Sequence, residues 1–219
     1  MDLNDEKLVA IDSYIKEKLS SDGYNHSRGV MERAIEYANI YGANEQYAAY
    51  AGLIHDVAKE VPKPQRVLLA EELGISLDNI EKNETALIHS KIGAYIAKKN
   101  FNLPEEVCEA VKTHTTGSTN MTLLQKIVYL ADYTSKDRTH PGAKEVYEIA
   151  KKNLDEAMIS TLKRTINFVL ERDRLVHPKT IEAYNYMILN NKEKRDWKVS
   201  FFISKKFRKF DNNVYKKNW

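Results

Sequence analysis

The sequence is short of cysteine, glycine and proline, and each shortage excludes a class of protein. A single cysteine, Cys108, excludes an internal disulfide, and its place in a helical pattern favours a small core side chain over a nucleophile. Eight glycines and five prolines are few for a fold of strands and tight turns. Because no run of about 18 apolar residues occurs, we expect no membrane span. The acidic N-terminus lacks the apolar stretch of a signal peptide, so we expect a cytoplasmic protein.

Positive charge is also scarce outside the end of the chain. Residues 191–219 contain ten Lys or Arg and three Asp or Glu, whereas the preceding part holds 24 basic and 28 acidic residues. The net charge of +3 therefore comes from the end of the chain. The length and composition predict one globular domain over residues 1–190, followed by a basic, aromatic extension over residues 191–219.

Apolar residues recur at helical spacing almost throughout the sequence, as in the stripe of Leu8, Ile11 and Ile15. Gly42 is a plausible helix stop, and Pro104 stands at a favoured first-turn position. We see no convincing strand and no internal repeat. The pattern predicts an all-α fold with helices at about 8–19, 24–41, 44–57, 65–73, 83–99, 104–113, 121–133, 143–151, 155–173 and 179–190.

The stretch from Leu53 to Lys59 places an adjacent imidazole and carboxylate, His55 and Asp56, at the end of an apolar helical segment. Neighbouring residues on a helix point about 100° apart, so both can ligate one ion that lies between them. Burying such a pair is costly unless a partner compensates it, and a divalent metal satisfies both groups. A His-Asp dipeptide alone is a weak signal, because such pairs are common by chance.

The distribution of the other candidate ligands strengthens the metal interpretation. His26, His55, His89 and His114 lie within predicted helices or at their ends, and Asp132 lies near the end of the most apolar one. Helix ends from several elements can converge on one mouth of a bundle. A mixed set of imidazoles and carboxylates suits a divalent transition metal with open positions. The alternative is a packed or surface His89 and a solvated Asp132, although the C-terminal end of a helix is electrostatically poor for a carboxylate.

Four segments together carry a resemblance to a known family. They are Tyr24–Val30, Ala51–Lys59, His114–Gly117 and Lys126–Asp132, the last followed by Arg138. In this order they resemble the HD-domain metal-dependent phosphohydrolases, and more closely the YqeK-type HD proteins of bacteria, over most of residues 5–190. The resemblance implies an HD-domain bundle of about eight to ten helices. It also implies symmetrical hydrolysis of diadenosine tetraphosphate to two ADP, with one or two divalent ions per chain, iron being the expected metal.

The resemblance further implies roles for individual residues. The expected metal ligands are His26, His55, Asp56 and Asp132, with His89 and His114 at positions that hold a second ion in related binuclear sites. Asp56 is expected to lie between the ions and to orient the attacking water, while Lys59 and Arg138 stabilise the phosphate charge. His114 either ligates metal or protonates the departing ADP. The expected nucleotide contacts are Gly23, Lys59, Glu60, Val61, Pro62, His89, His114, Thr115, Arg138, Arg174 and His177.

These residues also have plainer interpretations, and other functions stay open. Lys59 and Arg138 would by default be solvated charges, and His140 and His177 precede prolines, where histidine is usually structural. The alternatives are an HD phosphohydrolase that acts on another nucleotide and a slow, nucleotide-sensing metal protein. Expected partners are a dinucleoside polyphosphate or ADP, with a homodimer left open. Nucleic acid is disfavoured by the acidic domain, except through the extension, whose interleaved aromatic and basic side chains would suit adhesion to RNA or an anionic membrane. We favour the alternative of a partly ordered extension, or one that packs on its own domain or on a partner chain.

Overall fold

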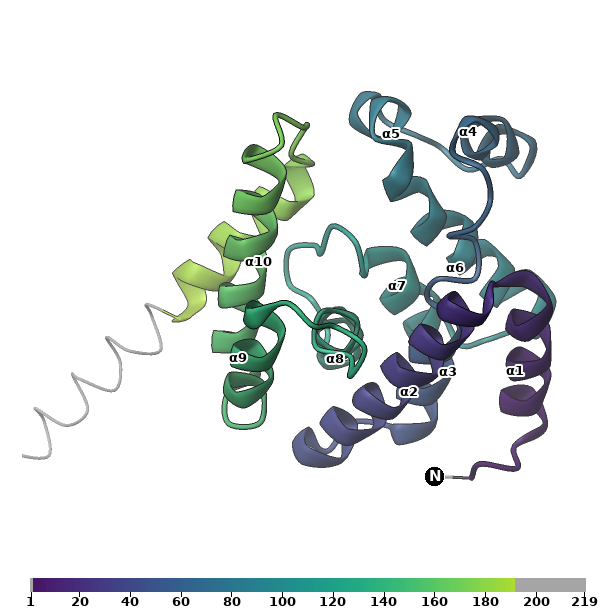
Figure 1. The fold of residues 1–219 in the computed structure, drawn as a ribbon, viewed down its shortest axis with the longest axis horizontal. Helices are drawn as coiled ribbons and strands as arrows, with labels where there is room; N and C mark the ends of the chain where they lie inside the picture. The colour runs from purple at the N-terminus through teal and green to yellow at the C-terminus, as the bar shows by residue number, and fades with distance from the viewer. Residues whose placement is uncertain (1, 192–219) are drawn as a thin grey trace, which may run out of the picture.

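The computed structural model describes residues 2–191, and within that range every regular element is a helix (Figure 1). This confirms the all-α prediction. The elements are α1 (Glu6–Lys18), α2 (Ser21–Tyr41), α3 (Glu45–Ile54), α4 (Lys63–Glu72), α5 (Asn79–Asn83), the short 3₁₀ helix η1 (Thr85–Leu87), α6 (Ile88–Phe101), α7 (Glu105–Thr113), α8 (Leu123–Tyr133), α9 (Pro141–Ala150), α10 (Leu154–Leu170) and a last helix over 178–191.

Side-chain caps explain where the helices that matter for the site begin and end. The side chains of Ser20 and Asn44 accept hydrogen bonds from backbone amides in the first turns of α2 and α3. Thr122 and Gln125 form a reciprocal capping box at the start of α8. Gly42 ends α2 in the left-handed conformation, with φ of 70°, as its place in the sequence predicts.

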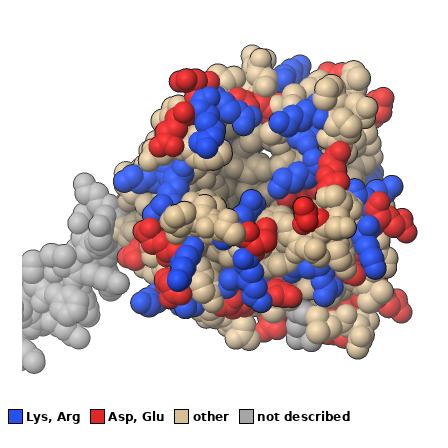
Figure 2. Space-filling model, viewed as in Figure 1, with Lys and Arg blue, Asp and Glu red and all other residues tan. Residues whose placement is uncertain are grey.

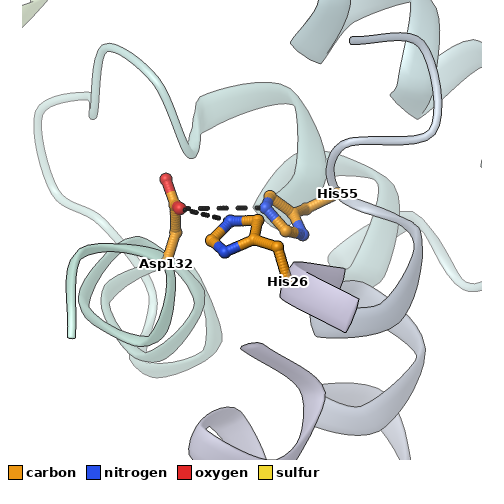
Figure 3. Close-up of side chains that lie close together, drawn as sticks. All are labelled: His26, His55 and Asp132. Carbon is orange, nitrogen blue, oxygen red and sulfur yellow. Dashed lines mark hydrogen bonds and ion pairs between the residues drawn. The ribbon is translucent and has the colours of Figure 1, made fainter. Parts of the chain in front are cut away.

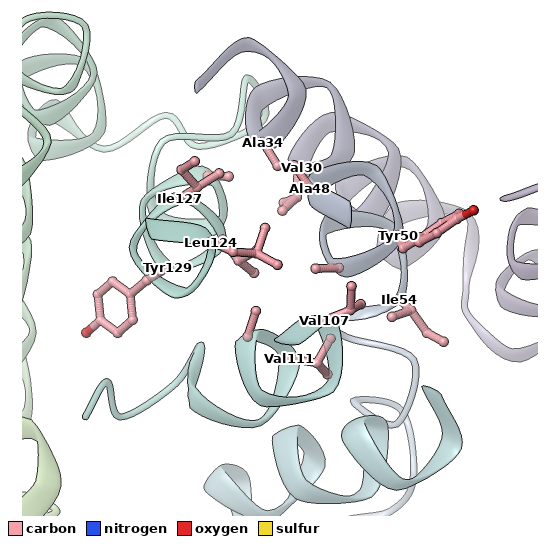
Figure 4. Close-up of a cluster of buried hydrophobic side chains, with 14 of the residues drawn as sticks. Val30, Ala34, Ala48, Tyr50, Ile54, Val107, Val111, Leu124, Ile127 and Tyr129 are labelled. Carbon is pink, nitrogen blue, oxygen red and sulfur yellow. The ribbon is translucent and has the colours of Figure 1, made fainter. Parts of the chain in front are cut away.

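The centre of the core is α3, which packs against α1, α2, α7 and α8. Its apolar side chains are almost completely buried, and Figure 4 shows them meeting those of α2, α7 and α8. On the far side of α8 from α1–α3, the helices α9 and α10 pack against each other and against α8 (Figure 1). Because α2, α3, α7 and α8 share one core, their ends are held in a fixed relation to one another.

Gly52 allows α2 and α3 to approach closely. A Cβ atom at this position would lie 2.8 Å from the Cα atom of Met31 and 3.1 Å from the carbonyl oxygen of Val30. Only glycine avoids this clash with the backbone of α2. The close approach brings His26 on α2 near His55, which directly follows α3.

Two of the helix boundaries that differ from the sequence prediction lie beside the candidate site residues. The helix predicted over 83–99 begins only at Ile88, as α6, after the separate short helices α5 and η1. Between α5 and η1, Glu84 leaves the helical conformation and accepts hydrogen bonds from Arg174 and from the backbone amide of Leu175. The helix predicted over 44–57 ends at Ile54, so His55 and Asp56 lie in the turn that follows it. The predicted extension lies, from residue 192 onward, outside the described residues. None of the helices in residues 2–191 combines the length and hydropathy that crossing a bilayer requires.

Candidate metal centre

The six expected metal ligands meet at one place, which we call the His–Asp cluster: His26, His55, Asp56, His89, His114 and Asp132. Each comes from near a helix end. His26 lies in the second turn of α2, His89 is the second residue of α6, and Asp132 is the penultimate residue of α8. His114 directly follows α7, as His55 and Asp56 follow α3.

Asp56 occupies the middle of the cluster, with its two oxygens directed to two sets of imidazoles. Its Oδ2 atom lies 3.2 Å from Nε2 of His55 and 3.7 Å from Nε2 of His26. Its Oδ1 atom lies 3.0 Å from Nε2 of His89 and 3.6 Å from Nε2 of His114. The carboxylate is almost completely buried, with only 2% of its surface exposed. This geometry fits one carboxylate shared between two neighbouring ion positions.

On the Oδ2 side of Asp56, His26, His55 and Asp132 form a compact group whose ligand atoms all lie within 4.8 Å of one another (Figure 3). Nε2 of His26 lies 3.0 Å from Oδ1 of Asp132, and Nε2 of His55 lies 3.9 Å from the same oxygen. The three side chains reach this point from three segments that are far apart in the sequence. Spacings of this kind place each ligand atom within reach of a common ion.

Hydrogen bonds fix the tautomer of every imidazole in the cluster. The Nδ1 atoms of His55, His89 and His114 lie 2.5–2.8 Å from backbone carbonyl oxygens three residues earlier. A carbonyl oxygen can only accept, so each Nδ1 carries the hydrogen and each Nε2 presents a lone pair to the cluster. Nδ1 of His26 lies 2.8 Å from Oδ2 of Asp137, an acceptor of the same kind. Metal-ligating histidines are usually held by such outer hydrogen bonds.

This arrangement of lone pairs is unfavourable unless a cation lies among them. Nε2 of His89 and Nε2 of His114 are only 3.1 Å apart, although both Nδ1 hydrogens are engaged elsewhere. Nε2 of His55 and Oδ1 of Asp56 are both buried without a hydrogen-bond partner. Oδ1 of Asp56 lies close to Nε2 of His89, but that nitrogen has no hydrogen to donate. Buried polar atoms without partners are costly. The imidazoles and carboxylates therefore fit a divalent transition metal.

Burial and neighbouring charge act in opposite directions on the ionisable groups of the cluster. Burial raises the pKa of Asp56, but His55 and the other imidazoles outweigh it and hold that pKa well below its usual range. For Asp132 burial is likewise outweighed, chiefly by the hydrogen bond with His26, and its pKa is also well below the usual range. Burial lowers the pKa of His89. The cluster thus offers ionised carboxylates and, at His89, a neutral imidazole, which are the forms that bind metal.

Two cationic side chains touch the carboxylates of the cluster. Nζ of Lys59 lies 2.5 Å from Oδ2 of Asp56, and Nη2 of Arg138 lies 2.6 Å from Oδ1 of Asp132. In the view of Figure 2 the molecule is hollowed between α10 and α5, with Lys and Arg on both sides of the hollow and some Asp and Glu among them. Positive charge around a concave site favours an anionic ligand such as a polyphosphate.

The remaining nucleotide contacts expected from the sequence form hydrogen bonds with residues outside the cluster, and Thr115 does so beside it, because it follows His114 and its partner Ser90 follows His89. Glu60 accepts hydrogen bonds from the backbone amide and the hydroxyl of Ser20. A Cβ atom at Gly23 would lie 2.7 Å from the Oε1 atom of Glu60. Arg174 pairs with Glu84. Thr115 donates a hydrogen bond to Ser90, and the ring of His177 bonds to Asp78. The carbonyl oxygen of Val61 accepts a hydrogen bond from Arg66, and Pro62 directly precedes α4.

Asp137 is a candidate functional residue that sequence reasoning missed. It accepts a hydrogen bond from His26 across 111 residues of sequence, and Ser135 donates to its other oxygen. No local pattern marks it, because it lies in a turn after α8 among other polar residues. Only the tertiary structure shows that it holds the ring of His26 in the cluster.

Comparisons with known proteins agree with this site. The profile of the family described as HD domain matches residues 23–137. A protein of Halalkalibacterium halodurans named bis(5'-nucleosyl)-tetraphosphatase, symmetrical, is 39% identical, and the alignment covers 81% of this chain and 95% of that protein. A Bacillus subtilis protein of the same name is 33% identical, with 85% and 98% covered. A crystal structure from Clostridium acetobutylicum, described as a predicted HD superfamily hydrolase involved in NAD metabolism, has a TM-score of 0.80 and 36% identity, with 83% of this chain and 97% of that chain covered.

Proposed function

This chain belongs to the HD-domain family, and on that premise we propose that it hydrolyses diadenosine tetraphosphate symmetrically to two molecules of ADP. The observation that carries the proposal is that relatives named for this activity align with the chain along 95% and 98% of their own length. The His–Asp cluster supports it, because hydrolysis of a phosphoanhydride is chemistry that a metal centre with imidazole and carboxylate ligands performs.

We propose the ligands as follows. His26, His55, Asp56 and Asp132 would hold one divalent ion, and His89 and His114 on the other side of Asp56 would hold a second. Bound metal supplies Lewis acidity toward phosphate oxygens and makes a water molecule more acidic. We propose iron as the metal. Elemental analysis of protein purified without oxygen tests its identity and number, and light scattering tests whether the chain forms a homodimer.

Lys59 and Arg138 are proposed to stabilise the negative charge that develops on the phosphate chain during cleavage. Their nitrogen atoms lie at the carboxylate oxygens of the cluster, so both cations would lie beside a phosphate chain bound there. His114 has only its Nε2 atom free, because Nδ1 donates to the carbonyl oxygen of Val111. It therefore serves either as a metal ligand or, once its Nε2 atom has taken up a proton, as the proton donor to the departing ADP.

Product analysis tests the proposed reaction. Protein loaded with iron, manganese or cobalt is incubated with diadenosine tetraphosphate, and the nucleotides are separated and measured. We expect ADP as the sole nucleotide product, and no reaction with Asp56→Ala. ATP together with AMP would show asymmetric cleavage and contradict the proposal. Turnover of another nucleotide alone would favour a different HD phosphohydrolase, and tight ADP binding with negligible turnover would favour a nucleotide sensor.

A further inference from the structure

A cavity of about 750 Å³ adjoins the His–Asp cluster, between the end of α8, the start of α9 and one face of α10. Asp132 and Arg138 form part of its wall, so the cavity borders the proposed reaction site. Of the residues expected to contact the nucleotide, only Arg138 lines it. Its volume lies within the range of about 300–1,000 Å³ that is typical of small-molecule sites. The cavity therefore provides binding space that the contacts expected so far do not use.

The α10 wall of this cavity combines an aromatic ring with two guanidinium groups. Arg164 and Phe168 are four residues apart and so lie on one face of α10, and Arg172 lies in the turn that follows the helix. Phe168 is 52% exposed, although it is a large apolar side chain, and the guanidinium of Arg172 lies 3.6 Å from the centre of its ring. Aromatic and guanidinium planes are the surfaces on which nucleobases stack, and arginine also pairs with phosphate.

The opposite wall adds two further rings. Tyr133 and His140 meet edge to face, with ring centres 4.9 Å apart. Burial and the nearby guanidinium groups lower the pKa of His140, and its Nδ1 atom accepts a hydrogen bond from the backbone amide of Ala143, so the ring is neutral. At Gly142 a Cβ atom would lie 3.0 Å from both Nη1 of Arg164 and Oη of Tyr133. The glycine thus leaves room for these two polar groups to reach the cavity.

Symmetrical cleavage places equal halves of the substrate on the two sides of the reacting bond. Asp56 divides the cluster into a His89–His114 side and a side with His26, His55 and Asp132. Thr115, an expected nucleotide contact, bonds to Ser90, next to His89, and so belongs to the first side. The cavity adjoins the second side through Asp132.

We propose that this α8–α10 cavity binds the second ADP half of the dinucleotide, with its adenine against Phe168 and Arg172 and its phosphates near Arg164 and Arg138. The inference rests on the proposed function for the identity of the ligand. It adds to that function a binding subsite and the residues that select a dinucleotide over a substrate with one nucleoside.

Kinetics with two substrates test the subsite. Metal-loaded protein is assayed with diadenosine tetraphosphate and with adenosine tetraphosphate, which has one nucleoside and can place it in the other half of the site. Phe168→Ala should lower kcat/KM for the dinucleotide roughly 5- to 150-fold, the loss expected for one base–aromatic stack. For adenosine tetraphosphate the change should be much smaller. Leu170→Ala, an exposed apolar position on the same helix that does not line the cavity, is the matched control. An unchanged dinucleotide kcat/KM, or an equal loss on both substrates, would overturn the inference.

Binding stoichiometry separates failure of the subsite from failure of the proposed function. Calorimetric titration of the metal-loaded protein with ADP should reveal a second ADP molecule per chain that is lost in Phe168→Ala combined with Arg164→Ala. This result is expected whether or not the protein turns over diadenosine tetraphosphate. A protein that binds the second ADP without cleaving the dinucleotide would retain the subsite and refute the activity. A protein that cleaves the dinucleotide but never binds a second ADP, even at saturating concentration, would retain the activity and refute the subsite.

Discussion

Replacement of Asp137 by alanine should weaken metal binding without removing any ligand. Asp137 accepts the Nδ1 hydrogen of His26 at 2.8 Å and is itself held by the hydroxyl of Ser135. The bond fixes the ring so that Nε2 faces Asp132, 3.0 Å away, and it makes Nε2 more basic. In Asp137→Ala the ring can rotate, and part of the binding free energy must be spent on orienting it.

The size of the effect follows from the exposure of the carboxylate. Loss of an outer hydrogen-bond partner of a metal ligand typically lowers metal affinity by about 10- to 100-fold. The Asp137 side chain is 47% exposed, so water can replace it as an acceptor in the variant. We therefore expect a loss near the lower limit, about tenfold, which corresponds to about 1.4 kcal/mol.

Competition between the protein and a chelator for cobalt measures this affinity. Asp137→Asn keeps an acceptor oxygen and should lose less affinity than Asp137→Ala. Lys136→Ala is the matched control, because its ammonium group pairs with Glu32 at an exposed position. Equal cobalt affinity in the wild type and Asp137→Ala would refute the orienting role. Equal losses in the Asn and Ala variants would show that charge, not the acceptor atom, is what matters.

Three further perturbations test the charge, the packing and the pH response. Arg138→Ala should retain metal but raise the activation free energy for kcat/KM by about 2–4 kcal/mol, the usual loss for one electrostatic donor, and unchanged kinetics would remove Arg138 from the mechanism. Gly52→Ala should lower the free energy of unfolding in urea by about 1–3 kcal/mol, because its Cβ would lie 2.8 Å from the Cα of Met31, and a stabilised variant would contradict the tight packing. The hydrogen bond from Arg174 lowers the pKa of Glu84 from its usual 4.5. The ion pair therefore stabilises the fold at pH values above 4.5, and this stabilisation is lost as the pH falls through the lowered pKa of Glu84. The Tm of the wild type should therefore exceed that of Glu84→Gln at neutral pH and approach it in acid, and a constant difference at every pH would be inconsistent with this linkage.

Local rules predicted the helices because their signals lie within a few residues of one another. Apolar spacing, Gly42 as a helix stop and Pro104 at a helix start each act over about one turn, and the structure contains the corresponding helices. The break at Glu84 was not predictable in this way, because the residue that holds it, Arg174, lies 90 positions further along the chain. Boundaries that depend on tertiary contacts are not visible to local rules.

The candidate site also has some features that the sequence predicted and others that only the tertiary structure shows. The sequence drew attention to the six side chains of the His–Asp cluster, and the structure brings them together, although their role as metal ligands stays a prediction. The shared position of Asp56 between two sets of imidazoles, the support that Asp137 gives His26 and the cavity beside α10 depend on how α2, α3 and α8 pack. That packing involves contacts such as Gly52 with Met31, for which the sequence offers no local signal.

The most direct test of the metal centre is the metal content of protein purified without oxygen, measured by elemental analysis in parallel for the wild type and Asp56→Ala. We expect at least one divalent transition-metal ion per chain in the wild type. Asp56→Ala should contain essentially none while keeping the helical circular dichroism of the wild type. Full metal occupancy in Asp56→Ala, or a wild-type protein that binds no transition metal even when iron, manganese and cobalt are supplied, would contradict the account.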